Sequence, residues 1–349
     1  MHVGLAVYGD LEPRSGGYLY DWRLAEGLRA RGDRVDVVSL PETSYPRSLG
    51  HNLSGRLKRE LERPFDVLLQ DELCHPSLVG LNRRIDREYP IVSIVHHLRA
   101  NETTGPKRHL FRAIERAYLS TVDAVVCNSR PTRAAVAELT DVPGVIAWPG
   151  GDRFGSYPSD DAIVERAREE PFEVVFVGNQ IPRKGLDSLV RGLSRVEEEW
   201  HLTVVGGAAD PEYSEGVRAL VRENGLADRV EFTGRLEEEA LADRLASAHL
   251  LAVPSIHEGF GIVYLEGMAF GLPALATTSG GASDVVTDGE TGYLVEPGDE
   301  AAIARAVEEC ASDRDRLVEL SLAARRRFER HPTWDGMAGR IRSFLETRV

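Results

Sequence analysis

Two glutamates eight residues apart, Glu258 and Glu266, flank a turn that contains glycines. Gly259 and Gly261 allow the backbone to bend closely around a bound group, and the apolar spacing that begins at Ile262 predicts a helix. An ionised carboxylate only accepts hydrogen bonds, so it suits the hydroxyl groups of a sugar or a ribose. The spacing alone also fits one solvated glutamate on a turn and another on an exposed helix face.

The predicted helix would present its first turn between the two carboxylates. Free backbone N–H groups and the positive end of the helix dipole suit an anion such as a diphosphate. One helical turn advances only about 5 Å, so Glu258 would lie beside one end of such a ligand and Glu266 near the other. We therefore expect a ligand with an anionic centre and hydroxyl groups on both sides of it.

The composition is that of a globular protein with room for two domains, since 42% of the 349 residues are hydrophobic and 28% are charged. The 56 acidic residues outnumber the 42 basic ones and give a net charge of −14. This balance argues against a nucleic-acid binder that gains affinity by neutralising phosphates. Lysine occurs only as Lys58, Lys107 and Lys184, so each lysine in this arginine-rich chain merits attention.

Cysteine usage and the N-terminus bear on localisation. Cys74, Cys127 and Cys310 are few, odd in number and far apart, which is typical of small buried side chains in a reducing compartment. The first ten residues lack a basic segment followed by a long apolar run, and no stretch approaches 18 apolar residues. We expect a cytoplasmic protein without a membrane span.

Short apolar runs alternate with longer amphipathic segments, which predicts the α/β class, with parallel strands crossed by helices. We expect a first domain over 1–155, a second over 172–331, an acidic, proline-containing linker over 156–171, and a terminal helix over 332–349. The predicted strands of the first domain are 2–7, 34–40, 65–70, 91–96 and 124–129, and those of the second are 173–179, 201–207, 230–234, 250–255 and 273–278.

Two further features lie near predicted strand ends. Neither half has G-x-G-x-x-G after its first strand, which disfavours a dinucleotide cofactor, and Gly16 and Gly17 lie in the first loop instead. His96 and His97 end a strand at the carboxyl edge of the predicted sheet, where open α/β sheets place ligands. No third ligand lies at useful spacing from these histidines, so we expect no metal site.

Taken together, these segments resemble the retaining GT-B glycosyltransferases of glycosyltransferase family 4 over nearly the whole chain. Glu258 and Glu266 match the family's Glu-x7-Glu signature. The other matching positions are Lys184 within 177–190, the glycine pair and turn of 279–299, Gly16 and Gly17, His96 after the fourth strand, and PGGD at 149–152.

The resemblance implies a fold and an activity. Two Rossmann-like domains would face a central cleft, with the nucleotide sugar held mainly by the second and the acceptor by the first, and the C-terminal helix would cross back to the first domain. The activity implied is retaining, metal-independent transfer of a hexose from a UDP- or GDP-sugar to a glycan, a lipid-linked acceptor or a small molecule. No cofactor is expected, and no nucleic acid.

The resemblance also implies residue roles. Glu258 would bind hydroxyls of the donor sugar, and Glu266 would bind the ribose. Lys184 would neutralise the diphosphate and stabilise the charge that builds as the nucleotide leaves. His96 would donate a hydrogen bond to the sugar or phosphate, which makes His96, Lys184 and Glu258 the predicted catalytic set. The other predicted donor-binding residues are Gly16, Gly17, Asn179, Arg183, Gly259, Phe260, Gly261, Ile262 and Val263.

The chain departs from the family pattern at two positions. His97 stands where the family commonly has an acidic residue, and strand register favours His96 as the histidine that faces the cleft. Asn179 stands where the family often has an arginine, and asparagine carries no charge for the diphosphate. Either Arg183 or a basic residue of the facing domain compensates, or the donor site holds its phosphates more weakly.

Other functions fit part of the pattern. An inverting enzyme of the same fold would need a base in the first domain, for which Asp10, Asp71 or His96 would serve. From another class, the chain would be a catalytically weak nucleotide-sugar-binding subunit, an alternative that Asn179 and His97 keep open. A nucleotide-sugar epimerase on the GT-B fold is a further alternative.

Two segments of the first domain, 51–65 and 106–120, are amphipathic and basic against the acidic background. Such helices bind anionic membrane surfaces and would bring a lipid acceptor to the site, at the inner membrane surface of the cell. Ordinary packed helices with a solvated basic face are the alternative. We expect the acceptor loops at 8–20, 42–63 and 97–108.

Overall fold

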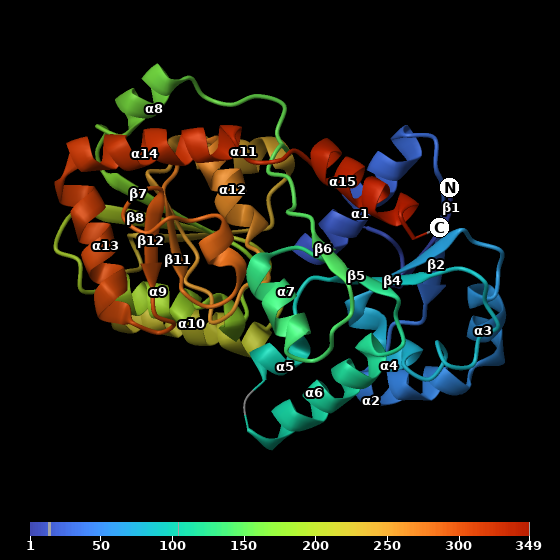
Figure 1. The fold of residues 1–349 in the computed structure, drawn as a ribbon. Coiled ribbons are helices and arrows are strands. Elements are labelled where there is room, and N and C mark those ends of the chain that lie inside the picture. Colours follow the sequence, from blue (N-terminus) through green and yellow to red (C-terminus); the bar gives the residue numbers. More distant parts are fainter. Residues whose placement is uncertain (13–14, 104, 349) are drawn as a thin grey trace. The chain divides into compact units, whose positions relative to one another are not determined.

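The computed structural model describes residues 1–12, 15–103 and 105–348. Residues 13 and 14 of the expected acceptor loop 8–20, residue 104 of the loop 97–108 and residue 349 of the expected terminal helix lie outside the described residues. The chain forms two compact units, one of Met1–Gly150 with Pro332–Val349 and one of Gly151–His331 (Figure 1).

The first unit is built on a six-stranded parallel sheet in the order β2-β1-β3-β4-β5-β6. β1 and β3 are neighbours, so the chain order reverses between them, and the interiors of β1, β3, β4 and β5 are buried on both faces. The five predicted strands are present, and β6 was missed because Pro143 and Gly144 interrupt its apolar run. The strands are β1 (His2–Tyr8), β2 (Arg34–Leu40), β3 (Val67–Asp71), β4 (Ile91–Val95), β5 (Ala124–Cys127) and β6 (Gly144–Ile146).

Helices from both ends of the chain complete the first unit. The C-terminal helix α15 packs against α1, and Figure 1 shows the two side by side in red and blue. Gly27 permits the close approach, because a Cβ there would lie 2.4 Å from Cβ of Ala338. The helices are α1 (Gly16–Ala30), α2 (Tyr45–Ser48), η1 (Leu49–Leu53), α3 (Gly55–Leu61), η2 (Glu72–Cys74), α4 (His75–Leu78), α5 (Arg99–Glu102), α6 (Pro106–Leu119), α7 (Arg130–Ala137) and α15 (Trp334–Glu346).

The second unit has its own six-stranded parallel sheet, in the order β12-β11-β10-β7-β8-β9. The chain order reverses between the neighbours β7 and β10. The carboxyl ends of strands at such a reversal are where open α/β sheets bind ligands. β12 was not predicted, since its short segment was interpreted as a turn. The strands are β7 (Phe172–Val177), β8 (Trp200–Val205), β9 (Val230–Gly234), β10 (Leu250–Ala252), β11 (Ala274–Thr277) and β12 (Gly292–Val295).

Four helices of the second unit start at a residue whose side chain caps the helix. Ser159, Asp210, Asp299 and Asp313 each accept a hydrogen bond from the N–H three residues further on. The helices are α8 (Asp160–Arg166), η3 (Pro182–Lys184), α9 (Leu186–Leu193), α10 (Pro211–Glu223), α11 (Glu238–Ser247), α12 (Ile262–Ala269), η4 (Gly281–Asp284), α13 (Glu300–Ser312) and α14 (Arg314–Glu329).

The segment 156–171, for which the sequence predicts a linker, carries α8 and belongs to the second unit. Ile163 is fully buried, and α8 packs against α14. The Arg166 guanidinium donates to the carbonyl oxygens of Phe270 at 2.8 Å and Gly271 at 3.1 Å. The acidic, proline-containing composition of this segment predicted a linker and gave no sign that Ile163 and Arg166 are buried.

Candidate active site

Lys184 and Glu258 come from the loops that follow β7 and β10, the two strands at the reversal of the second sheet. The Lys184 ammonium donates to Oε2 of Glu258 at 2.7 Å, and the Ser255 hydroxyl donates to the same oxygen at 3.0 Å. Nη1 of Arg183 lies 3.8 Å from that oxygen. Three predicted site residues, Arg183, Lys184 and Glu258, therefore lie together.

Glycines bring these loops into contact. Gly185 has φ +68°, and a Cβ there would lie 2.2 Å from the carbonyl oxygen of Pro254. Gly280 has φ +85°, and its Cβ would lie 2.0 Å from the carbonyl oxygen of Glu258. The Gly281 N–H donates to that same carbonyl at 2.7 Å. The glycine pair at 280–281 thus fixes the backbone that carries Glu258.

The charge on Glu258 is set by its neighbours. Burial alone would raise the pKa of this carboxyl, but Lys184 and Arg183 outweigh burial and lower the pKa to about 2. Both bonded neighbours use Oε2, and Oε1 takes no hydrogen bond from the described residues. Glu258 therefore offers an ionised oxygen to the hydroxyl group of a ligand.

The start of α12 has the predicted features of an anion site. Gly261 precedes the helix with φ +89°, and Ile262 and Val263 form its first turn. No acceptor in the described part of the chain takes the amide hydrogens of Phe260 or Gly261. These two amides and the positive end of the α12 dipole are available to a ligand beside Glu258.

Glu266 lies in the second turn of α12 and is 5% exposed. Arg153 donates to its Oε1 at 3.2 Å. Burial raises the pKa of the Glu266 carboxyl, and Arg153 opposes that rise. Sequence reasoning did not identify Arg153, which is one of many arginines and lies 113 residues away.

Asn179 and Arg183 lie in one loop, between β7 and the end of η3. The Asn179 side chain makes no hydrogen bond with the described residues. Arg183 Nη1 donates to the carbonyl oxygen of His257 at 2.9 Å, which holds this guanidinium beside Glu258. The arrangement supports Arg183 as the second cation of the site, which remains a prediction.

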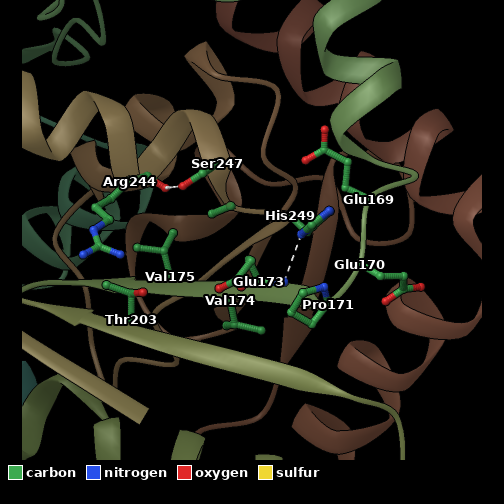
Figure 2. Close-up of a pocket in the computed structure, with 11 residues that line it drawn as sticks. Glu169, Glu170, Pro171, Glu173, Val174, Val175, Thr203, Arg244, Ser247 and His249 are labelled. Atoms are coloured by element: carbon green, nitrogen blue, oxygen red, sulfur yellow. Dashed lines mark hydrogen bonds between the residues drawn. The ribbon is translucent and has the colours of Figure 1, made fainter. Parts of the chain in front are cut away.

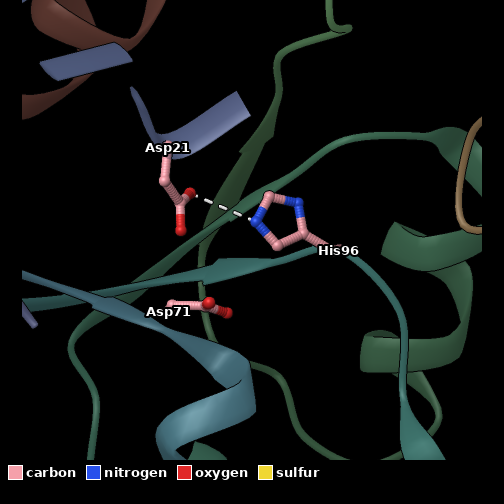
Figure 3. Close-up of side chains that lie close together, drawn as sticks. All are labelled: Asp21, Asp71 and His96. Atoms are coloured by element: carbon pink, nitrogen blue, oxygen red, sulfur yellow. Dashed lines mark hydrogen bonds and ion pairs between the residues drawn. The ribbon is translucent and has the colours of Figure 1, made fainter. Parts of the chain in front are cut away.

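In the first unit, His96 follows β4 and belongs to a buried cluster with Asp21 of α1 and Asp71 at the end of β3 (Figure 3). His96 Nε2 lies 3.1 Å from Oδ1 of Asp21. Gly17 lets the chain pass against the ring, because a Cβ there would lie 3.2 Å from Cδ2 of His96. Gly16 opens α1 and is exposed.

Two carboxylates control the protonation of His96. Burial lowers the pKa of the imidazole, but Asp21 and Asp71 outweigh burial and raise it to about 9. Burial and Asp21 also raise the pKa of Asp71 well above its usual range. A protonated His96 is therefore favoured in this cluster, and Asp71 holds a proton more strongly than an ordinary carboxyl does.

Two carboxylates that are distant from His96 in the sequence, Asp21 and Asp71, lie beside it in the structure. Ligand atoms of Asp21, Asp71 and His96 lie within 4.8 Å of one another, a spacing that would suit a metal ion. Without a metal ion, the positive charge of a protonated His96 would offset the negative charge of Asp21, and a proton on Asp71 would remove a second negative charge. A second such group, in the same unit, consists of Glu72, His75 and Glu115.

His97 lies apart from this cluster. Its Nε2 is 3.5 Å from Oε1 of Glu102, and its side chain is 25% exposed. It lines a cavity of about 300 Å³ together with Tyr45 and Arg99. The histidine in contact with the first-loop glycine Gly17 is therefore His96, and which histidine faces the donor stays a prediction.

A pocket of about 280 Å³ in the second unit lies away from the predicted site (Figure 2). Pro171 and His249 line it and immediately precede β7 and β10, so it lies at the amino edge of the sheet. His249 Nδ1 accepts from the Glu173 N–H at 2.9 Å, and burial lowers its pKa to about 4. We interpret this neutral histidine as structural.

Comparison with known proteins agrees with this geometry. Residues 160–327 match the family described as glycosyl transferases group 1, and residues 20–151 match glycosyltransferase family 4. The chain is a member of glycosyltransferase family 4 with the GT-B fold, and it is a glycosyltransferase.

Two relatives share most of its length. A GDP-mannose-dependent alpha-(1-6)-phosphatidylinositol monomannoside mannosyltransferase of Mycobacterium tuberculosis is 35% identical over 94% of this chain and 88% of its own. The protein of the same name from Mycolicibacterium smegmatis is 32% identical over 99% of this chain and 98% of its own.

Solved structures share the fold at lower identity. Sucrose-phosphate synthase from Thermosynechococcus elongatus superposes with a TM-score of 0.85 at 24% identity, covering 99% of this chain and 98% of its own. Anabaena HepE in complex with UDP-glucose gives a TM-score of 0.80 at 19% identity, covering 99% of this chain and 100% of its own.

Proposed function

We propose that this glycosyltransferase moves a hexose from a nucleotide sugar to an acceptor hydroxyl with retention of anomeric configuration and without a metal ion. The observation that supports binding of a nucleotide-sugar donor is the contact of Lys184 with Glu258 at the carboxyl ends of β7 and β10. This contact sets a cation for phosphate next to an ionised acceptor for sugar hydroxyls. GDP-mannose is the donor that we favour, because two of the relatives similar over nearly the full length are named for it.

The proposed division of roles follows from available donors and acceptors. Lys184 has three N–H donors and uses one on Glu258, which leaves two for the diphosphate. Glu258 keeps Oε1 for hydroxyls of the transferred sugar, and the Phe260 and Gly261 amides lie beside it. Glu266 would accept from the ribose. His96, held as an imidazolium, would donate to the sugar or the phosphate.

In the proposed reaction, the bond between the anomeric carbon and the leaving phosphate oxygen breaks. A bond from the acceptor oxygen to the same face of that carbon forms. The acceptor proton passes to the departing phosphate oxygen, and a nucleoside diphosphate is released. Lys184 stabilises the charge on that phosphate, a contribution that grows as the bond breaks.

For the acceptor we favour an inositol-containing molecule. The relatives are named for phosphatidylinositol monomannoside, and a further relative, 31% identical over 93% of this chain, is named D-inositol 3-phosphate glycosyltransferase. The lipid and the soluble phosphate share the inositol ring, so paired assays with the two acceptors separate them.

A lipid acceptor would require contact with a membrane surface, and of the two predicted segments we propose α6 for this contact. Lys107, Arg108 and Leu110 are exposed on its first turns, and neither cation forms an ion pair with the described residues. In the α3 segment, Lys58 and Arg63 are paired with Glu62 and Asp36, whereas Arg56 and Arg59 are exposed and form no ion pair with the described residues. None of the helices in the described residues combines the length and hydropathy that a membrane span requires.

The deciding experiment measures release of nucleoside diphosphate from GDP-mannose, UDP-glucose and UDP-galactose, with and without phosphatidylinositol monomannoside or inositol 3-phosphate. We expect turnover of one donor that is lost in Glu258→Gln and Lys184→Met. NMR of the product assigns its anomeric configuration, and chelator addition should leave the rate unchanged. Binding of a donor without turnover would favour the non-catalytic alternative, and an inverted product would refute retention.

A further inference from the structure

Arg153 connects three elements of the second unit. Its Nη1 donates to Oε1 of Glu266 at 3.2 Å, and its Nε donates to Oε2 of Glu238 at 3.1 Å. Arg153 lies in the segment before α8, Glu266 lies in α12, and Glu238 is the first residue of α11. One guanidinium thus holds the position of the carboxylate that the proposed function assigns to ribose.

The three side chains differ greatly in exposure. The Glu266 side chain is 7% exposed, against 28% for Arg153 and 53% for Glu238. A buried carboxylate stays ionised only if a cation or several donors compensate for its lost hydration. Glu238 can satisfy its charge with water, so the partner that depends on Arg153 is Glu266.

Other charged groups around α12 do not replace Arg153. Arg166 of α8 donates to the carbonyl of Phe270, and Arg325 of α14 donates to the carbonyl of Ala269. Both carbonyls lie at the C-terminal end of α12, beyond Glu266. Glu238 acts in the opposite sense, because its negative charge disfavours ionisation of Glu266.

The contact leaves half of the carboxylate free. Arg153 occupies Oε1, while Oε2 takes no hydrogen bond from the described residues and is not among their buried atoms without a partner. An ionised carboxylate with one oxygen fixed in this way accepts hydrogen bonds from neighbouring hydroxyls, whereas a protonated carboxyl loses an acceptor site.

We propose that Arg153 is a positioning residue of the donor site, which holds Glu266 ionised and oriented so that it accepts hydrogen bonds from the ribose hydroxyls of the nucleotide. This inference rests on the proposed function. It predicts that Arg153 governs discrimination of ribose from deoxyribose rather than binding of the diphosphate.

The test is calorimetric titration with GDP and 2′,3′-dideoxy-GDP, and in parallel with UDP and its dideoxy form, at pH 6 and pH 9. We expect the wild-type protein to prefer the ribose form by about tenfold at both pH values, as loss of a hydrogen bond to a charged group implies. In Arg153→Met the preference should fall toward one at pH 6. It should recover in part at pH 9, because an unpaired Glu266 has a further raised pKa and ionises only as the pH rises.

Three variants bracket this result. Glu266→Gln should lack most of the preference at both pH values, and Arg153→Lys, which keeps the charge, should retain it at both. Arg168→Met removes an exposed arginine that pairs with Asp315, and it should behave as wild type. Melting temperatures show whether each variant folds. If Arg153→Met does not fold, Arg153→Lys still tests whether a positive charge at this position is enough for the ribose preference.

Three different results would contradict the proposed role of Arg153. An unchanged ribose preference in folded Arg153→Met would overturn the proposal. Tighter nucleotide binding in that variant would also overturn it, by showing that Arg153 competes with ribose for Glu266. Equal binding of ribose and dideoxy forms by the wild-type protein would refute the ribose role of Glu266 and this inference with it, while turnover of a sugar donor would leave the proposed transferase activity intact.

Discussion

Lys184 and Glu258 are 74 residues apart in the chain, and the ammonium of one donates to the carboxylate of the other at 2.7 Å. Sequence reasoning assigned the lysine to the diphosphate and the glutamate to the sugar, as if the two acted at separate points. In the proposed function, this contact would place both groups at the junction of sugar and phosphate, where the bond would break.

The contact predicts strong coupling between the two residues. Lys184→Met and Glu258→Gln should each lower kcat about 10²- to 10³-fold, as the loss of a preorganised electrostatic contact does. The double variant should lose much less than the product of the two factors, because residues in contact are not additive. Initial rates of nucleotide release from the wild type, the two single variants and the double variant form a double-mutant cycle. If the two losses in kcat multiply fully, the residues do not act as a unit.

Arg183 is predicted to supply the positive charge that Asn179 lacks. Arg183→Ala should weaken binding of the nucleoside diphosphate about tenfold, the loss of a hydrogen bond to a charged group. Binding of the nucleoside, which lacks phosphate, should not change. Calorimetric titration of both ligands measures the difference. Unchanged affinity for the diphosphate would exclude Arg183 from this role.

Gly280 and Gly298 both have a positive φ, +85° and +80°. Alanine at Gly280 would place its Cβ 2.0 Å from the Glu258 carbonyl oxygen, whereas at Gly298 no atom lies within 4 Å. Gly298→Ala should cost roughly 1 kcal/mol of stability from backbone strain alone. Gly280→Ala should cost more and also lower activity. Urea unfolding and turnover measure both, and equal effects would argue against a role for the close contact.

The pairing of His96 with Asp21 predicts a pH dependence of stability. Because the folded-state pKa is raised to about 9, the contribution of protonated His96 is complete below its ordinary pKa of about 6.5 and is lost as the pH rises through about 9. A shift of that size corresponds to roughly 3 kcal/mol. Asp21→Asn should therefore destabilise the protein more at pH 6 than at pH 9.5.

Urea unfolding at the two pH values measures this difference. NMR titration of the imidazole gives the pKa directly and should show a lower value in Asp21→Asn. A destabilisation that does not vary with pH would mean that Asp21 acts through packing or hydrogen bonding rather than through the charge of His96.

The α6 surface predicts salt-sensitive binding to anionic lipid. Vesicles with phosphatidylinositol should sediment with the wild-type protein at low salt and less so at 0.5 M salt, because screening weakens surface charges. The variant Lys107→Gln/Arg108→Gln should bind less. Arg168→Gln/Arg222→Gln removes two ion-paired arginines of the second unit and should bind as wild type. Equal binding by both variants would exclude α6 as the contact.

The amino-acid sequence by itself determined the two α/β halves and the family, because hydrophobic periodicity and motif spacing are local properties of the chain. Ten strands were predicted, while β6 and β12, whose segments contain glycines and lie beside prolines, were missed. The loop–helix turn from Glu258 to Glu266 was equally visible, since its glycines and apolar pattern lie within a few residues.

Only the tertiary structure decided which charges meet. Asp21 of α1 contacts His96 after β4, and Arg153 binds Glu266, which is 113 residues away in the chain. Ile163 of α8 is buried although the surrounding segment is acidic. An arginine or aspartate on the surface has the same local pattern as one that is buried and paired. Burial and partners, which set pKa values and hydrogen-bond geometry, depend on how distant segments pack, and no local pattern records that.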